Sequence, residues 1–354
     1  MPQRKIKEHE QTINYAMLSL FQYLASIMVI LLHCQRLFGN EAMHFIQKSI
    51  FGRMAVPFFL ISSAFLLKAS LAKKTDIRQY VRRFLKQYLF WSMLYLPYAL
   101  TYFWSLPVKK YYAPLAMVAG FLYVGLCYQL WYIPAYLLGL WIVHFLYKKL
   151  DIKWTVIILF LLYLIGAVET YYAYFANSWL THLYDGYARL FFSTRNGIFY
   201  APIFILMGYV LYDYWQSDLF KKYPIRKLLL ATILLCVDGW IVFVNQGVDK
   251  NFFLALLPFS IFLVNAVLRT EVGKKLNLYH LKKLSVLYFF LHPIFIESSF
   301  YLLQGASMSK EDKGKIVFVL TLILTQLTAE GILMVRKSMF KKRANTYRDK
   351  LKEG

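Results

Sequence analysis

The stretch NYAMLSLFQYLASIMVILLHCQ, residues 14–35, decides the fold class of this protein. It contains no Lys, Arg, Asp or Glu, and an α-helix needs about 20 mostly apolar residues to cross roughly 30 Å of hydrocarbon. It is longer than the apolar core of a signal peptide, so we interpret it as an uncleaved first transmembrane helix. The composition agrees, because 59% of the 354 residues are hydrophobic and only 17% are charged. These features predict an integral membrane protein.

Nine more apolar windows of similar length follow along the chain. Together they predict an all-α, polytopic protein with about ten transmembrane helices, at residues 14–35, 51–71, 87–106, 128–147, 154–173, 197–216, 228–245, 252–269, 284–304 and 315–336. A further apolar stretch at 111–125 is shorter and interrupted by proline and glycine, so we expect an interfacial or re-entrant segment there. We expect the connection at 176–196 to lie on the membrane surface or to cap a site.

The basic residues predict the orientation of these helices. With the N-terminus inside, 30 of the 41 Lys and Arg residues fall in cytoplasmic segments, as the positive-inside rule requires. A full span at 111–125 would move every later basic loop outside. We therefore expect both termini in the cytoplasm, with residues 1–13 as an N-terminal segment, 14–337 as the membrane domain and 338–354 as a basic tail. The net charge of +23 then reflects topology, and we expect no nucleic-acid partner.

Polar residues form a stripe along the first helix. Ser19, Gln22, Ser26 and His33 are offset by 3, 7 and 14 positions from the first of them, which keeps them near one helix face. Gln22 lies toward the cytoplasmic half, and His33 lies about 16 Å further along the axis, toward the outer half. Such a stripe either hydrogen-bonds to neighbouring helices or lines a hydrated path. For His33, the residues alone leave helix packing and chemistry equally open.

Ionisable residues in or beside the later spans are also candidates for function, because charge is costly inside a membrane. Arg53 opens the second span and either reaches the lipid headgroups or faces the protein interior. Arg195 and Asn196 stand at the outer boundary, and His292 and Glu330 lie within late spans. The basic segment KKTDIRQYVRRFLKQ, residues 73–87, suits anionic lipid headgroups or the phosphates of a ligand. Three cysteines without metal-type spacing predict no metal site.

Five stretches resemble acyltransferase family 3, a family of integral-membrane acyltransferases. They are FQYLASIMVILLHCQ (21–35), RMAVPFFLISSAFLL (53–67), YVRRFLKQYLFW (80–91), YQLWYIPAYLLGLWIV (128–143) and LSVLYFFLHPIFI (284–296). The first resembles the family's first helix, where an arginine precedes the catalytic histidine with ten residues between them. His33 matches this histidine, whereas Gln22 stands in place of the arginine. Lys86 stands where a second arginine would follow Arg83, and Gln129 stands where histidine is common.

The resemblance implies transfer of an acyl group, usually acetyl, from cytoplasmic acyl-CoA to a hydroxyl of an extracytoplasmic glycan or cell-envelope molecule. It implies His33 as the catalytic group, acting as general base or as acyl carrier. Arg53 would assist at the developing oxyanion or hold an anionic acceptor. The basic residues suited to CoA phosphates are Arg82, Arg83 and Lys86. Supporting or substrate-binding residues are expected at Gln22, Ser63, Trp131, Arg195, Asn196, His292 and Glu330.

The same resemblance places the protein in the cell membrane of a bacterium, with the lipid bilayer and cell-envelope biosynthesis proteins as expected partners. An alternative function remains open. Relatives of this fold include membrane portions of serine-racemase-like proteins associated with amino-acid uptake, and RMAVPFFLIS (53–62) and STRNGIFYAPIFILMG (193–208) are similar to them. With glutamine at position 22, a transport or binding role without catalysis is the second interpretation. A structural role in a cell-envelope assembly is the third.

Overall fold

The computed structural model describes residues 12–107 and 109–350, and it describes side chains as far as residue 339. The described residues form helices and connections, with no β-strand among them, which confirms the all-α class. The predicted N-terminal segment 1–13 lies outside the described residues except for its last two positions. Most of the predicted tail 338–354 is described only by its backbone, which continues the last helix to Lys350.

Every predicted span coincides with one or two helices. In chain order these are α2 (Tyr15–His33), α4 (Gly52–Ala72), α5 (Ile77–Leu94) with α6 (Leu96–Ser105), α8 (Tyr132–Lys149), α9 (Ile152–Ala167), α11 (Ala201–Asp213), α13 (Pro224–Val244), α14 (Leu256–Arg269), α15 (Tyr279–Leu302) and α16 (Lys310–Lys350). Shorter elements connect them: α3 (Glu41–Phe45), η1 (Ile46–Phe51), η2 (Lys110–Tyr112), α7 (Ala113–Ala119), η3 (Gly120–Val124), η4 (Tyr172–Phe175), α10 (Trp179–Phe191) and α12 (Asp218–Lys221).

Five helical segments of the described chain are long and apolar enough to cross a membrane. They are α2, the continuous run Glu41–Ala72, α13, α15 and Lys310–Met339. Helices α9, α11 and α14 are apolar but have 16, 13 and 14 residues, and 13 residues cover only about 20 Å. The count of ten spans and the cytoplasmic placement of both termini therefore stay predictions. The stretch 111–125 divides into η2, α7 and η3, each too short to cross a membrane.

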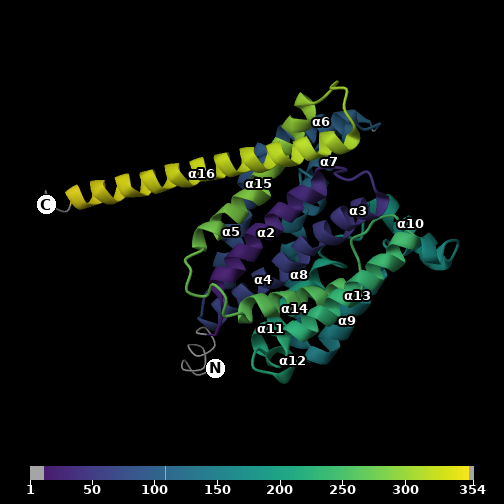
Figure 1. Ribbon diagram of the computed structural model, residues 1–354, viewed down its shortest axis with the longest axis horizontal. Coiled ribbons are helices and arrows are strands. Elements are labelled where there is room, and N and C mark those ends of the chain that lie inside the picture. Colours follow the sequence, from purple (N-terminus) through teal and green to yellow (C-terminus); the bar gives the residue numbers. More distant parts are fainter. Residues whose placement is uncertain (1–11, 108, 351–354) are drawn as a thin grey trace.

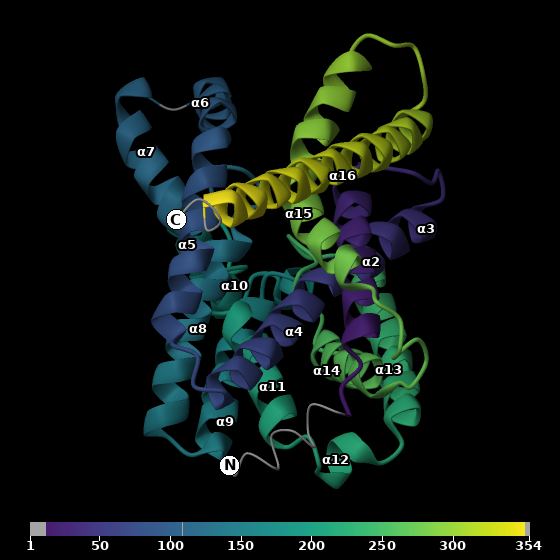
Figure 2. The ribbon, with the colours of Figure 1, turned by 90° about the vertical axis from the view of Figure 1, so that its left-hand side faces the viewer.

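Helix α4 is the centre of the packing. It contacts α11, α2 and α14, while α2 also packs on α15 and α15 on α16. In Figure 2, α5, α8 and α9 lie on one side of α4 and α11, and α2, α13 and α14 lie on the other. The C-terminal part of α16 extends beyond this body (Figure 1).

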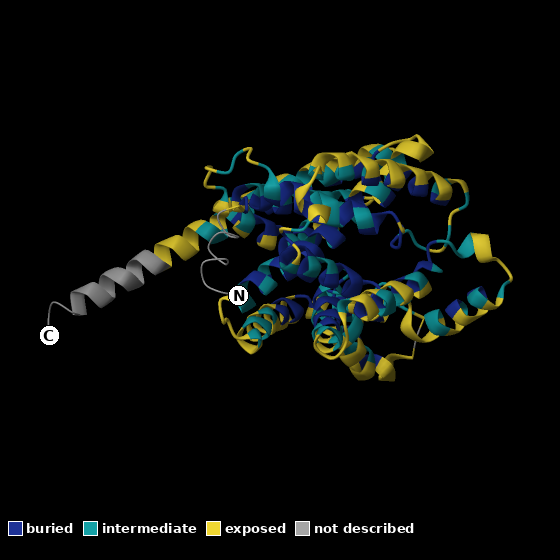
Figure 3. Cartoon of the chain, turned by 90° about the horizontal axis from the view of Figure 1, so that it is seen from below, coloured by how far each residue is buried: buried dark blue, intermediate teal, exposed yellow. Residues whose placement is uncertain are grey.

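Small residues allow the closest of these approaches. At Gly208 in α11, an added Cβ would lie 2.4 Å from the carbonyl oxygen of Ile61 and 2.7 Å from Cβ of Ala64, both in α4. Small residues of this kind let two membrane helices bring their backbones together. Buried residues therefore concentrate on the inner helices, and exposed residues lie on the outer faces (Figure 3). The outer faces of α13 and α16 carry large apolar side chains, as contact with lipid requires.

Candidate functional site

A cavity of about 470 Å³ lies among α2, α4, α5, α8 and α15, within the size range of small-molecule sites. Its walls include Arg53 and Ser70 of α4, which are separated by about 25 Å of helix. Gln22 and His33 of α2 line it as well. The cavity thus extends along most of the roughly 30 Å thickness of a bilayer's hydrocarbon.

His33 occupies the end of the cavity that we predict to face outward. It is the last residue of α2, and its ring lies 4.5 Å from that of Tyr128 and 5.8 Å from that of His292. His292 is fully buried, and its Nδ1 donates to the carbonyl oxygen of Tyr288 at 2.7 Å. This bond leaves Nε2 of the neutral His292 ring as an acceptor, and Nε2 has no partner among the described residues. His292 is therefore held in a fixed orientation against His33.

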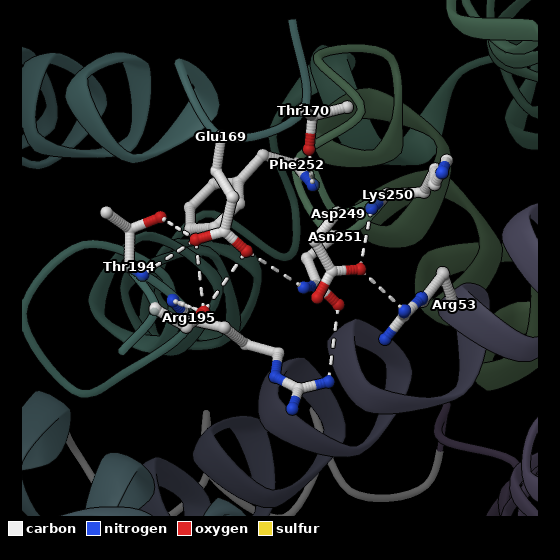
Figure 4. A network of polar contacts seen from close by, with 10 residues as sticks. Arg53, Glu169, Thr170, Thr194, Arg195, Asp249, Lys250, Asn251 and Phe252 are labelled. Atoms are coloured by element: carbon white, nitrogen blue, oxygen red, sulfur yellow. Dashed lines mark hydrogen bonds and ion pairs between the residues drawn. The ribbon is translucent and has the colours of Figure 1, made fainter. Parts of the chain in front are cut away.

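Two arginines face the same end of the cavity. Arg53 Nη2 forms an ion pair with Asp249 Oδ1 at 2.8 Å. The guanidinium of Arg195 lies over the ring of Trp131, 4.6 Å from its centroid, and Nη1 donates to Asn251 Oδ1 at 3.4 Å. Figure 4 shows both arginines with their partners from the connection between α13 and α14. Burial works to raise the pKa of Asp249, but Arg53 and Arg195 outweigh it and hold that pKa below its ordinary value.

A buried carboxylate anchors the segment that carries Arg195. Glu169 Oε2 accepts from the Thr194 backbone N–H at 2.7 Å and from Thr194 Oγ1 at 2.6 Å, and Ser193 Oγ donates to it at 3.0 Å. Asn251 Nδ2 donates to the other oxygen at 3.4 Å. These donors occupy Glu169, so it does not pair with Arg195. Among the described residues, Asp249 forms an ion pair with Arg53, whereas Arg195 contacts Asn251 and the Trp131 ring. Arg53 Nε is also buried without a described partner. A negatively charged ligand group would be stabilised here.

The opposite end of the cavity is lined by Arg83 and Gln87 of α5 and by Lys282 and Ser285 of α15. Ser285 Oγ donates to the backbone oxygen of Gln22 at 2.9 Å, and Gln22 Nε2 lies 3.5 Å from Ser62 Oγ. Lys282 lies one helical turn from Ser285 on the same face. The structure therefore places a lysine at the level of the neutral Gln22 side chain.

Seven of the predicted site residues line this cavity. They are Gln22, His33, Arg53, Ser63, Arg83, Trp131 and Arg195. Arg82 and Lys86, by contrast, are exposed on α5 and do not line it.

The other predicted residues lie around the cavity or away from it. His292 does not line the cavity, but its ring stacks on the ring of His33. Asn196 is buried where the connection enters α11, and its Oδ1 accepts from the backbone N–H groups of Ile198 and Phe199 at 2.8 and 3.1 Å. Glu330 on α16 contacts His280 Nε2 at 2.9 Å and accepts from Gln326 at 3.0 Å. These contacts give Asn196 and Glu330 structural partners.

The serines of the first-helix stripe bond within their own helix. Ser19 Oγ donates to the carbonyl oxygen of Tyr15 at 2.8 Å, and Ser26 Oγ donates to that of Tyr23 at 2.6 Å. In the stripe, the two serine hydroxyls are therefore hydrogen-bonded within the helix. The other two residues, Gln22 and His33, line the cavity.

Several lining residues were not predicted from the sequence. Lys282, Gln87 and Asn251 line the cavity, and Asp249 holds one of its arginines. In the sequence, Lys282 belongs to a basic segment that the positive-inside rule explains, although its i, i+3 spacing to Ser285 indicates a polar helix face. Asp249 and Asn251 lie in a short connection that carries no recognisable motif.

The model of acyltransferase family 3, described as an acyltransferase domain, matches residues 16–329. The chain belongs to acyltransferase family 3. That stretch contains every residue of the cavity, from Gln22 to Phe290. The match assigns this stretch to a family described as an acyltransferase domain, and it names neither a donor nor an acceptor for this chain.

The chain is also similar to racemases of two Enterococcus species. It is 27% identical to a serine/alanine racemase of Enterococcus gallinarum over 321 residues, covering 86% of this chain and 44% of the relative. It is 30% identical to an amino-acid racemase of Enterococcus faecalis over 235 residues, covering 62% of this chain and 32% of the relative. The chain thus spans less than half the length of these relatives. No solved structure matches it.

Proposed function

We propose that this protein moves an acyl group from cytoplasmic acyl-CoA to a hydroxyl group of an acceptor at the opposite side of the membrane. The observation that carries this proposal is that one continuous cavity is lined by Arg83 and Lys282 at one end and by His33, Arg53 and Arg195 at the other. One end offers cations for phosphate groups, and the other offers an imidazole beside two guanidinium groups. The length of the cavity suits a donor whose reactive thioester lies at the end of a long arm.

In this mechanism His33 acts as a general base. It takes the proton of the acceptor hydroxyl as the oxygen attacks the thioester carbonyl. The C–S bond of the thioester breaks, a C–O ester bond forms, and the proton passes from the imidazolium to the departing CoA thiolate. Arg53 or Arg195 stabilises the negative charge on the carbonyl oxygen or on the acceptor. Acyl transfer through the His33 ring itself uses the same groups in two steps. His292 is a positioning residue, because its ring stacks on His33.

Lys282 supplies the positive charge that Gln22 lacks. The family's arginine belongs at position 22, but here a neutral amide lines the cavity. Lys282 lines the same region from α15, one turn from the serine that bonds to the Gln22 backbone. A cation is therefore present in this part of the cavity, on a different helix. In this proposal, Lys282 and Arg83 bind the phosphates of the donor, and Arg82 and Lys86 contribute only a surrounding positive potential.

The experiment that tests the proposal uses inside-out membrane vesicles containing the protein and acetyl-CoA labelled in the acetyl group. We expect release of free CoA and labelling of an acceptor, both dependent on the protein. The glutamine at position 22 favours one other candidate, a carrier of small solutes without catalysis. The names of the relatives suggest an amino acid as the solute to test. Uptake of an amino acid such as serine in right-side-out vesicles, with no acetyl-CoA consumed in inside-out vesicles, would support the carrier and reject acyl transfer.

A further inference from the structure

A second cavity, of about 390 Å³, lies among the ends of α4, α8 and α11 that we predict to be cytoplasmic. Its polar lining includes Lys68, His144, Tyr147, Lys148, Tyr209 and Asp213. Leu66, Leu67 and Ser70 of α4 line the first cavity, so one stretch of α4 separates the two. None of the groups proposed for acyl transfer belongs to this second cavity.

The charges in the second cavity favour an anion. Asp213 is satisfied by Lys68, 3.1 Å away, and by the Tyr147 hydroxyl, which donates to it at 2.5 Å. Lys148 and His144 line the cavity in addition. Two lysines therefore face the single carboxylate, and the His144 ring adds an N–H donor. The Tyr209 side chain is 2% exposed, and its hydroxyl is buried without a hydrogen-bond partner among the described residues. Because such a hydroxyl is costly to leave unpaired, it indicates a polar ligand.

The surface of α8 beside this cavity is apolar and aromatic. Trp141 is 66% exposed and Phe145 is 52% exposed, and their rings stack with centroids 6.1 Å apart. Positions 141, 145 and 148 follow the i, i+4, i+7 spacing that places residues on one helix face. An aromatic surface that leads to a lysine at the end of the helix matches the interface between acyl chains and headgroups.

We propose that this cavity binds the phosphate of an anionic phospholipid headgroup. Lys148, His144 and the Tyr209 hydroxyl would contact the phosphate oxygens, and the acyl chains would lie along Trp141 and Phe145. Basic pockets between helices on the cytoplasmic side of a membrane bind such headgroups. The lipid would stabilise α4, α8 and α11 as a unit, and α4 and α8 also line the first cavity. The site is independent of the acyl-transfer proposal.

The test uses the full chain in nanodiscs of phosphatidylcholine containing a minor fraction of phosphatidylglycerol, with retained lipids counted by native mass spectrometry. The wild-type protein is expected to retain phosphatidylglycerol selectively. Lys148→Gln and Tyr209→Phe are each expected to weaken retention about fivefold, as loss of about 1 kcal/mol of headgroup attraction implies. The matched control is Lys149→Gln, because Lys149 is an exposed neighbour outside the cavity.

Two outcomes would overturn the proposal. Equal loss of retention in Lys148→Gln and Lys149→Gln would mean general attraction between a basic surface and anionic lipid. Selective protection of the wild-type protein against thermal unfolding by inorganic phosphate, in discs of phosphatidylcholine alone, would identify a site for small anions. Both measurements read lipid binding or stability, so they are independent of whether the protein transfers acyl groups.

Discussion

At the scale of single residues, the first prediction concerns Lys282, which lines the cavity near Gln22. Lys282→Gln removes a charge-assisted contact worth about 1.5–3 kcal/mol, so KM for acyl-CoA should rise about 10- to 150-fold. Adding Gln22→Arg to Lys282→Gln should recover much of this loss, because the arginine restores the charge from α2. Lys283→Gln is the matched control, since Lys283 is exposed and does not line the cavity. A double variant that folds but is as impaired as Lys282→Gln alone would refute the compensation.

The two arginines beside His33 predict a preference for charged acceptors. Glycerol, glycerate and glycerol phosphate all offer hydroxyl groups, but only the last two carry an anion for Arg195. We expect glycerate and glycerol phosphate to accept acyl groups at least about tenfold faster than glycerol. The measurement is acyl-CoA consumption at equal acceptor concentration. Arg195→Gln should abolish the preference, and Arg189→Gln, an exposed arginine of α10, should keep it. Equal rates with all three compounds would mean that the arginines do not bind an anionic acceptor and instead stabilise the oxyanion.

At the scale of elements, α4 packs closely on α11 and also lines the first cavity. An added methyl group at Gly208 would lie 2.4 Å from the Ile61 carbonyl oxygen, so the helices must separate. Gly208→Ala should lower the free energy of unfolding by about 1–3 kcal/mol and lower Tm in detergent. Gly186→Ala in α10 meets no atom within 4 Å and should instead be neutral or stabilising by up to about 1 kcal/mol. An unchanged Tm in Gly208→Ala would contradict the close packing described here.

The helices were predictable from the sequence because membrane helices have uninterrupted apolar windows. The window 14–35 contains α2 (Tyr15–His33), and the window 284–304 overlaps α15 (Tyr279–Leu302). The site was predictable only in part. His33 and Arg53 could be recognised as polar groups at the ends of apolar runs. Arg195 could be recognised because it directly precedes the apolar window 197–216. Asp249 gave no such signal, because its partner Arg53 is 196 residues away in the chain and only the packed fold brings them together.

At the scale of the whole molecule, orientation decides which end of the cavity meets acyl-CoA. Cys236 is exposed, so Cys236→Ser provides the background for labelling single added cysteines with a membrane-impermeant maleimide. Ala176→Cys should react in intact cells, and Lys221→Cys should react only in inside-out vesicles; both positions are exposed. The reverse pattern would place His33 toward the cytoplasm and contradict the direction of transfer proposed here.

The most direct test of acyl transfer is the His33→Ala variant in inside-out vesicles supplied with labelled acetyl-CoA. Loss of the general base should reduce transfer about 100-fold or more, while Tm stays near the wild-type value because His33 lines a cavity. His182→Ala, which removes an exposed histidine of α10, should leave the rate unchanged. Transfer by His33→Ala at the wild-type rate would contradict the account.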